Sequence, residues 1–179
     1  MARRTTSEAG VDHGGARAPA VVQQRDIPDA IRPLSAVLEA DYVDVFSMST
    51  PGHAVSPEQW ARAGIEDAAG VQGQFVWRVL LGLRLERRQS PSYVGGWKIA
   101  DRGDDWLRLE AASWFLTAHI VVHVDERCLS IATLIHYDQP VARAIWPPVS
   151  VGHRWAMPGL LRGALRSLER AEEPVSSSI

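Results

Sequence analysis

The hydrophobic pattern of the central chain follows two different periods. Residues 42–46 (Tyr-Val-Asp-Val-Phe) alternate and are rich in β-prone side chains, which predicts a strand. Four further segments have the same character: about 94–100, 106–112, 115–124 and 129–137. Turn-forming residues occupy 101–105, between the second and third segments, and 125–127, between the fourth and fifth. The pattern therefore predicts five strands.

Two helices are predicted after the first strand. Ser56 is a typical N-cap, Pro57 suits a first helical turn and Gln59 can complete a capping box. This helix is expected to run to about residue 69 and to bury Trp60, Ala63, Gly64 and Ala68. The second helix is predicted over about 74–85, and its buried stripe consists of Phe75, Val79 and Leu83.

The end of the chain predicts a long helix behind a proline break. Residues 141–146 form a short helical segment, which Pro147 and Pro148 are expected to stop. A final helix then continues to about residue 172, with apolar residues at helical spacing: Leu160, Leu161, Ala164, Leu165 and Leu168. Because Pro158 lies inside this stretch, the helix is expected either to kink or to start there.

Together these elements predict an α+β fold. It has a curved antiparallel sheet, two short helices after the first strand and a long C-terminal helix packed on the sheet. Residues 1–39 are expected to be a leader that is disordered up to about residue 25, because it has no apolar period, and a transition segment that Pro28 and Pro33 interrupt. A single domain is expected over 40–172, followed by a frayed tail at 173–179.

The last two strands allow a prediction of register. If 126–127 is a two-residue turn, Asp125 pairs with Cys128, and one sheet face carries four pairs: Val122–Ile131, Ile120–Thr133, Ala118–Ile135 and Leu116–Tyr137. The opposite, mixed face carries His123–Ser130, Val121–Ala132, His119–Leu134 and Thr117–His136. The apolar face is therefore predicted to be the core beneath the final helix. Its polar exceptions, Thr133 and the Tyr137 hydroxyl, are expected to contact the helix backbone or a ligand.

Charge, cysteine content and apolar runs limit the partners and the compartment that can be expected. The formal net charge of −2 gives no basic field for nucleic acid. Cys128 is the only cysteine, so no intramolecular disulfide is possible, which fits a reducing compartment. No signal peptide is recognisable and no apolar run approaches the ~20 residues of a membrane span. A cytoplasmic protein without a membrane span is predicted.

Known cofactor and metal motifs are missing from the sequence. It contains no dinucleotide fingerprint, phosphate loop, zinc pattern or nucleophile elbow, so no cofactor is expected. Gly95 and Gly96 open a strand, which favours close packing or a bulge. Three histidines share the mixed sheet face: His119, His123 and His136. They lack an obvious carboxylate or thiol to complete a ligand set, so no metal site is expected.

Several residues are candidates for binding a ligand. Seven tryptophans favour either a bulky core or a ligand cavity, and Trp97 shares its strand face with Ile99. His153 and Arg154 are expected either to point into the mouth between helix and sheet, where they would bind an anionic group, or to form a surface pair. The predicted ligand-binding residues are Trp97, Ala118, Ile120, Thr133, Tyr137, His153 and Arg154. If there is catalysis, its candidates are Tyr137, His153 and Arg154.

The C-terminal third resembles a known family. The residues that carry the resemblance are Ser130-Ile-Ala-Thr-Leu-Ile-His-Tyr137, Arg143, Ile145-Trp146, Pro148, His153-Arg154, Pro158, Leu161-Arg162 and Ala164. They are similar to the closing signature of a bacterial domain-of-unknown-function family, which occurs alone or fused behind a short-chain-dehydrogenase-like domain. The similarity covers about 40–170 and is strongest after Leu129. That family resembles the START-like (SRPBCC, helix-grip) superfamily of lipid carriers and polyketide cyclases.

The resemblance implies a cavity between the sheet and the terminal helix, suited to a small apolar or aromatic ligand. It implies no catalytic residue. No fused dehydrogenase domain lies within this sequence. The five predicted strands are fewer than full helix-grip domains have, which implies a small or collapsed cavity.

Three functions remain open at this point. The first is a module that binds a small hydrophobic or aromatic molecule without chemistry, and it requires space between sheet and helix. The second is a cyclase or isomerase acting on a polyketide-like or other apolar substrate, which requires a titratable group inside that space. The third is a protein-interaction module or homodimer that uses a Trp-rich surface, and it requires a contiguous exposed apolar patch.

Overall fold

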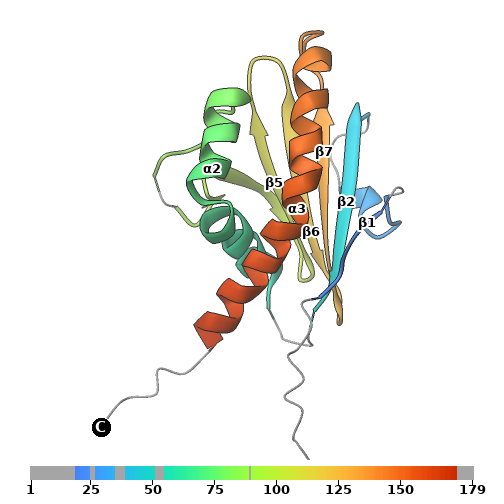
Figure 1. Ribbon diagram of the computed structural model, residues 1–179, viewed down its shortest axis with the longest axis vertical. Coiled ribbons are helices and arrows are strands. Elements are labelled where there is room, and N and C mark those ends of the chain that lie inside the picture. The colour runs from blue at the N-terminus through green and yellow to red at the C-terminus, as the bar shows by residue number, and fades with distance from the viewer. Residues whose placement is uncertain (1–18, 25–26, 35–38, 51–54, 89, 173–179) are drawn as a thin grey trace, which may run out of the picture.

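A seven-stranded antiparallel sheet forms the framework of the protein (Figure 1). The computed structural model describes residues 19–24, 27–34, 39–50, 55–88 and 90–172. The strands are β1 (Val21–Gln24), β2 (Tyr42–Ser49), β3 (Tyr93–Val94), β4 (Trp97–Arg102), β5 (Trp106–Ala112), β6 (Thr117–Val124) and β7 (Cys128–His136). Their order across the sheet is β1-β2-β7-β6-β5-β4-β3. The α+β class and the antiparallel sheet are therefore confirmed, with two more strands than predicted.

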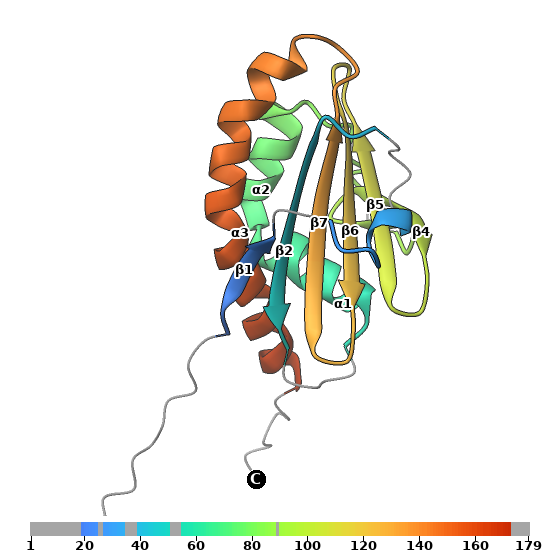
Figure 2. The same cartoon turned by 90° about the vertical axis from the view of Figure 1, so that its right-hand side faces the viewer.

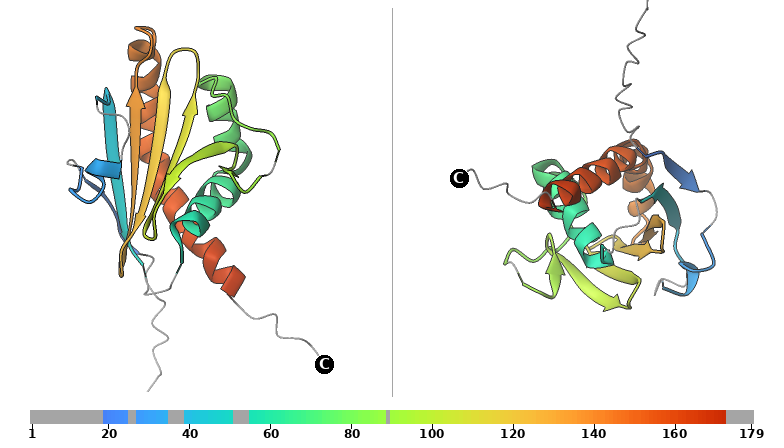
Figure 3. Two further views of the ribbon diagram at one scale, coloured as in Figure 1. Left: turned by 180° about the vertical axis from the view of Figure 1, so that it is seen from behind. Right: turned by 90° about the horizontal axis from the view of Figure 1, so that it is seen from below.

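The helices lie together on one side of this sheet (Figure 2). They are α1 (Pro57–Arg62), the π-helical segment η2 (Ala63–Ala68), α2 (Gly70–Phe75), the π-helical segment η3 (Val76–Leu80) and α3 (Ala142–Glu172). The predicted capping box is present, because Ser56 Oγ accepts from the Gln59 amide and the Gln59 side chain accepts from the Ser56 amide. Seen from below, the strands form a curved layer around the helices (Figure 3).

The predicted register of β6 and β7 is confirmed. Val122 pairs with Ile131, Ile120 with Thr133 and Ala118 with Ile135. These residues belong to the main core, or pack against it, together with residues of α3 such as Met157, Leu161 and Leu165. The final helix therefore covers the predicted apolar face, because side chains two apart in a strand share one face.

The opposite sheet face is covered as well, which the sequence did not predict. A short 3₁₀ turn, η1 (Arg32–Leu34), follows Ile31, whose side chain is 1% exposed. Ile31 forms a second, smaller core with Val45, Val121, Ala132 and Leu134. Residues 27–34, which were assigned to a leader and transition segment, thus bury the apolar part of the mixed face.

The structure corrects part of the predicted disordered leader. The prediction of disorder up to about residue 25 is wrong for Val21–Gln24, which pair with β2 as an edge strand. These residues carry no strong hydrophobic pattern, and main-chain pairing with a partner strand determines their conformation. The rest of the predicted leader up to residue 18, and the predicted tail at 173–179, lie outside the described residues.

The second helix was predicted wrongly in both its extent and its buried face. It spans α2 and η3, Gly70–Leu80, and it exposes Phe75 (60%) and Val79 (65%). The chain leaves the helix at Gly82, whose φ is +60°. Leu81, Leu83 and Leu85 are then buried alternately with exposed residues. This period of two is typical of an extended segment, which the prediction had wrongly included in the helix.

The expected proline break before the last helix is also wrong. A single helix, α3, contains Pro147, Pro148 and Pro158. Burial of Ala142 and Trp146 anchors the first turns, and Ser150 Oγ donates to the Pro147 carbonyl at 2.8 Å. Tertiary packing therefore offsets the lost amide donors. The ribbon of α3 bends along its length (Figure 1), as prolines commonly cause. Among the described residues no helix is long and apolar enough to span a membrane.

Candidate functional site

A buried carboxylate interrupts the apolar sheet face beneath α3. Asp44 of β2 pairs with Thr133 of β7, which in turn pairs with Ile120 of β6, so the three side chains form one row across the sheet. The Asp44 side chain is only 2% exposed, and Thr133 is also buried. Because a buried charge is costly without partners, the groups that surround Asp44 decide what the site can do.

His153 of α3 is the first partner of Asp44. Its Nε2 lies 3.3 Å from Asp44 Oδ2 and 3.2 Å from Thr133 Oγ1. Trp146, Met157 and Leu161 are buried at helical spacing around His153, so the packed stripe of α3 aims the imidazole at the sheet. A carboxylate only accepts hydrogen bonds, which assigns the proton to Nε2. When the ring is neutral, Nδ1 carries its lone pair, and no described residue bonds to this atom.

Tyr42 is the second partner of Asp44. Its hydroxyl donates to Asp44 Oδ2 at 2.6 Å and accepts from Nη1 of Arg154 at 3.2 Å. The Arg154 guanidinium lies 6.0 Å from the centroid of the Tyr42 ring. Burial, followed by the hydrogen bond to Asp44 and the charge of Asp44, raises the pKa of Tyr42, and Arg154 opposes this shift. The hydroxyl therefore keeps its proton and directs it at the carboxylate.

Aromatic rings surround this polar cluster. Trp146 packs edge-on against Tyr42, with ring centroids 5.2 Å apart, and lies 6.1 Å from the ring of His153. Phe46 is 6.5 Å from His153 on the other side. Trp146 is 3% exposed, and its Nε1 has no hydrogen-bond partner among the described residues. Tyr42, Asp44, Thr133, Trp146, His153 and Arg154 are called the seam cluster below.

The sheet floor beside the seam cluster is incompletely covered. Ile120 and Ile131 lie on the helix-facing side of two central strands, yet both are only partly buried. Their neighbours on the same face, Ala118 and Val122 for example, are fully buried. Thr133 adjoins both isoleucines, since it pairs with Ile120 and follows Ile131 by two residues. The accessible surface of the floor is thus next to His153.

The structure brings five of the seven predicted ligand-binding residues into this region. Thr133, His153 and Arg154 belong to the seam cluster, and Ile120 forms the adjoining floor. Ala118 lies one row away, opposite Ile135, and is fully buried. The interpretation of His153 and Arg154 as an isolated surface pair is therefore wrong.

Trp97 and Tyr137 lie elsewhere. Trp97 belongs to β4, which three strands separate from β2, roughly 19 Å at the usual strand spacing. It packs edge-on against Trp77 and is fully buried. Tyr137 follows the end of β7, and its hydroxyl bonds to none of the described residues. Burial, then the charge of Asp41, raises the pKa of Tyr137.

Three members of the seam cluster were not predicted: Tyr42, Asp44 and Trp146. A signal for the first two was present, because Tyr42, Asp44 and Phe46 alternate with apolar residues that belong to the other sheet face. Which of the two faces meets α3 could not be determined from that strand alone, because both carry apolar residues. Trp146 was assigned to a separate helical piece.

The histidines of the opposite face do not form a comparable site. His119 is buried, which lowers the pKa of its imidazole, and its Nδ1 lacks a partner among the described residues. His123 and His136 each lie near exposed or half-exposed aspartates. Within the described ranges no group of three or more His, Cys, Asp or Glu side chains is placed to hold a metal ion.

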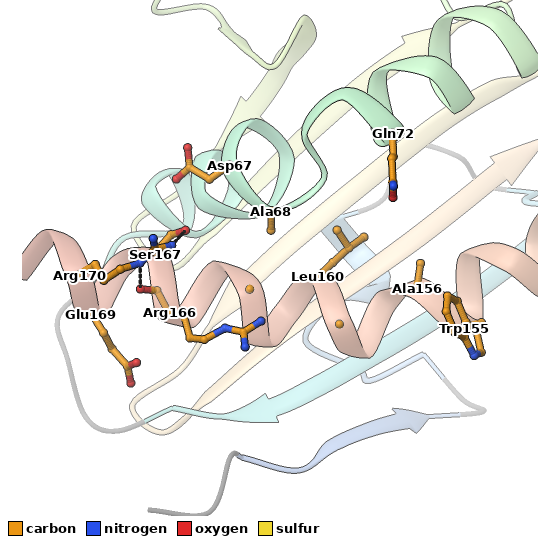
Figure 4. Close-up of a pocket in the computed structure, with 12 residues that line it drawn as sticks. Asp67, Ala68, Gln72, Trp155, Ala156, Leu160, Arg166, Ser167, Glu169 and Arg170 are labelled. Atoms are coloured by element: carbon orange, nitrogen blue, oxygen red, sulfur yellow. Dashed lines mark hydrogen bonds between the residues drawn. The ribbon is translucent and has the colours of Figure 1, made fainter.

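An open groove of about 770 Å³ lies outside the core, between α3 and the η2–α2 segment (Figure 4). Small residues leave room for it: Ala68, Ala156, Gly159 and Gly163. Trp155 lies at one end and is 87% exposed, whereas Arg166, Ser167 and Arg170 lie toward the other. Arg170 is hydrogen-bonded to Ser167 and to the Arg166 carbonyl, so part of its hydrogen-bonding capacity is used within α3. The groove is a competing location for a ligand.

Replacement of Tyr42 by phenylalanine is expected to reduce the loss of stability at alkaline pH. Because the pKa of Tyr42 is raised in the folded protein, the unfolded chain releases this proton first, above about pH 10. The free energy of unfolding of the wild type then falls as pH rises, and Tyr42→Phe lacks this contribution. Urea unfolding of both proteins from neutral to about pH 11 measures the difference. Parallel pH curves would contradict the prediction.

The comparisons with known proteins give no family assignment. No family model matches the chain, and no curated protein matches it. Two solved structures are similar. One is the protein Mll3558 from Rhizobium loti, with 16% identity, a TM-score of 0.35, and coverage of 72% of this chain and 97% of that chain. The other is EF2215 from Enterococcus faecalis, described as a conserved protein of unknown function, with 13% identity, a TM-score of 0.30, and coverage of 82% and 86%.

Proposed function

We propose that this protein binds a small molecule with an apolar or aromatic body between the sheet and α3. The observation that carries the proposal is the partial exposure of Ile120 and Ile131 in the middle of the sheet, although Leu109, Ala118 and Val122 beside them on the same face are buried. The apolar floor formed by these two isoleucines adjoins the polar seam cluster. Small-molecule sites commonly combine an apolar lining with a few polar groups. The rings of Phe46 and Trp146 supply aromatic walls.

The proposal includes a helix-grip architecture of the START-like type. A curved antiparallel sheet with a long C-terminal helix across one face is consistent with that architecture. In such an arrangement the ligand is enclosed between α3 and the sheet. The groove of Figure 4 lies between α3 and the η2–α2 segment and is not the site we propose.

Tryptophan fluorescence tests the proposal and locates the ligand. We expect a saturable change when fatty acids, flat aromatics or polyketide-like compounds are titrated into the wild type, because Trp146 adjoins the site. Trp146→Phe should remove most of this change. Two control variants should retain the fluorescence change: Trp155→Phe, in the outer groove, and Trp97→Phe, on strand β4 far from β2.

A blocking variant separates the site from other locations. Ile120→Trp enlarges a side chain that is only partly buried, so it should fill the space without the overpacking expected at fully buried Ala118. Calorimetric titration of this variant should show no binding although its circular dichroism is unchanged. Binding that survives Ile120→Trp but is lost in Trp155→Phe would place the ligand in the groove and contradict the proposal.

The second candidate is an enzyme of the cyclase or isomerase type. The observation that favours it is the pair of Asp44 and His153, in which the carboxylate orients the imidazole and leaves Nδ1 as a potential base. Exchange of acidic C–H protons in a bound carbonyl compound for deuterium, followed by NMR, would reveal proton transfer. If exchange occurs in the wild type and equally in His153→Gln, His153 is not the base and this candidate fails.

A further inference from the structure

Arg154 has more hydrogen-bond donors than partners. A guanidinium has five N–H groups, and within the described residues Arg154 uses one of them, toward the Tyr42 hydroxyl. No described acidic side chain lies within ion-pair distance of it. Arg62, by contrast, binds Glu58 and Glu66, and Arg78 binds a glutamine and two carbonyls. Arg154 is therefore a half-buried cation without a direct ion-pair partner among the described residues.

The carboxylate nearest in the cluster forms no direct ion pair with Arg154. Asp44 already accepts from Tyr42 at Oδ2 and lies 3.3–3.4 Å from His153 Nε2. The Tyr42 hydroxyl lies between Asp44 and Arg154, since it donates to one and accepts from the other. The raised pKa of Tyr42 means that this hydroxyl remains neutral and offers Arg154 no negative charge.

A second donor beside Tyr42 also lacks an acceptor. The Trp146 ring contacts the Tyr42 ring, and its buried Nε1 has no partner among the described residues. An indole N–H can only donate. Two groups that need an acceptor, Arg154 and Trp146, thus flank one tyrosine. A buried donor without an acceptor is costly, so a ligand that supplies oxygen acceptors would stabilise both.

We propose that the ligand of this site is an acid, and that the Arg154 guanidinium binds its carboxylate or an equivalent anionic oxygen group. This inference rests on the proposed binding site and names its class of ligand: an apolar or aromatic body over Ile120 and Ile131 with an anionic end at Arg154. A planar guanidinium matches a carboxylate with two parallel hydrogen bonds, and its own orientation is fixed by the Tyr42 hydroxyl and ring.

The test compares an acid with its uncharged analogue of similar shape. Calorimetric titrations of the wild type with 2-naphthoate and 2-naphthamide are expected to show at least about tenfold tighter binding of the acid. Arg154→Gln should abolish this preference and leave binding of the amide nearly unchanged. Arg154→Lys, which keeps the charge without the fork, should retain part of it. Arg166→Gln, in the outer groove, is the matched control and should behave as the wild type.

The outcomes separate this inference from the proposed function. If acid and amide bind equally, and Arg154→Gln changes neither affinity, the inference is overturned while apolar binding stands. If Arg166→Gln alone abolishes the preference, the anion binds in the groove and the inference is wrong. If neither naphthalene probe nor any compound of the wider panel binds folded wild type, the proposed function itself fails. If Arg154→Gln does not fold, the ratio of the affinities for acid and amide is compared between the wild type and Arg154→Lys. An equal ratio in both proteins would overturn the inference.

Discussion

Replacement of Asp44 by alanine is expected to lower the free energy of unfolding by about 3–5 kcal/mol. The Asp44 side chain is 2% exposed, and its removal leaves the Tyr42 hydroxyl without its acceptor and His153 Nε2 with Thr133 alone. The contact between Asp44 and His153 connects β2 to α3, so its loss acts on the packing of the helix against the sheet. Urea unfolding followed by circular dichroism measures the effect.

A second aspartate–histidine pair serves as the matched control for this prediction. Asp105 lies 3.5 Å from His123, but its side chain is 63% exposed. Exposed ion pairs contribute about 1 kcal/mol at most, so Asp105→Ala should change the stability little. Asp44→Asn, which keeps the shape but has one acceptor oxygen instead of two and no charge, should fall between the two. Equal effects of Asp44→Ala and Asp105→Ala would show that the seam cluster does not hold α3 on the sheet.

Replacement of Gly96 by alanine is expected to cost about 2 kcal/mol or more. The φ angle of Gly96 is +91°, and an added Cβ would lie 2.6 Å from the Glu86 carbonyl oxygen and 2.9 Å from the Leu85 Cβ. The amide of Glu86 donates to the Gly96 carbonyl at 3.0 Å, so neither segment can move away without losing this bond. Thermal unfolding of the variant should show a clearly lower midpoint.

Gly152 is the matched control for Gly96. It lies inside α3, and an added Cβ would meet no atom within 4 Å. Alanine favours a helix interior over glycine, so Gly152→Ala should raise the stability by about 0.5–1 kcal/mol. Similar effects of the two substitutions would indicate that the backbone at Gly96 is not constrained by its positive φ.

Gly95 and Gly96 form the turn between β3 and β4, whereas the sequence placed them at the opening of a strand. They were predicted to permit close packing or a bulge, and both have positive φ angles. The Gly95 amide donates to Glu66 and its carbonyl accepts from Gln74, so this turn joins the sheet edge to the helices. The identity of these two helical partners could not be predicted, because they lie 29 and 21 residues away.

In the candidate site, the local sequence pattern predicted the position of Thr133 but not its distant partner. Thr133 was predicted to be a polar exception on the core face, because the two-residue turn at 126–127 fixes which residues of β6 and β7 share a face. That His153 is its partner depends on how α3 lies across the sheet. Asp44 and His153 are 109 residues apart, and no local pattern relates them.

Local periodicity determined the strands β2 and β4–β7, the register of β6 with β7, the capped start of α1 and the apolar face beneath α3. These features depend on neighbouring residues, whose side-chain period reports directly on the backbone. The tertiary structure decided the pairing of β1, the cover at Ile31, the continuity of α3 through three prolines and the assembly of the seam cluster. Each of these depends on burial against a distant segment, and the free energy of such burial outweighs the weak local preferences of the residues concerned.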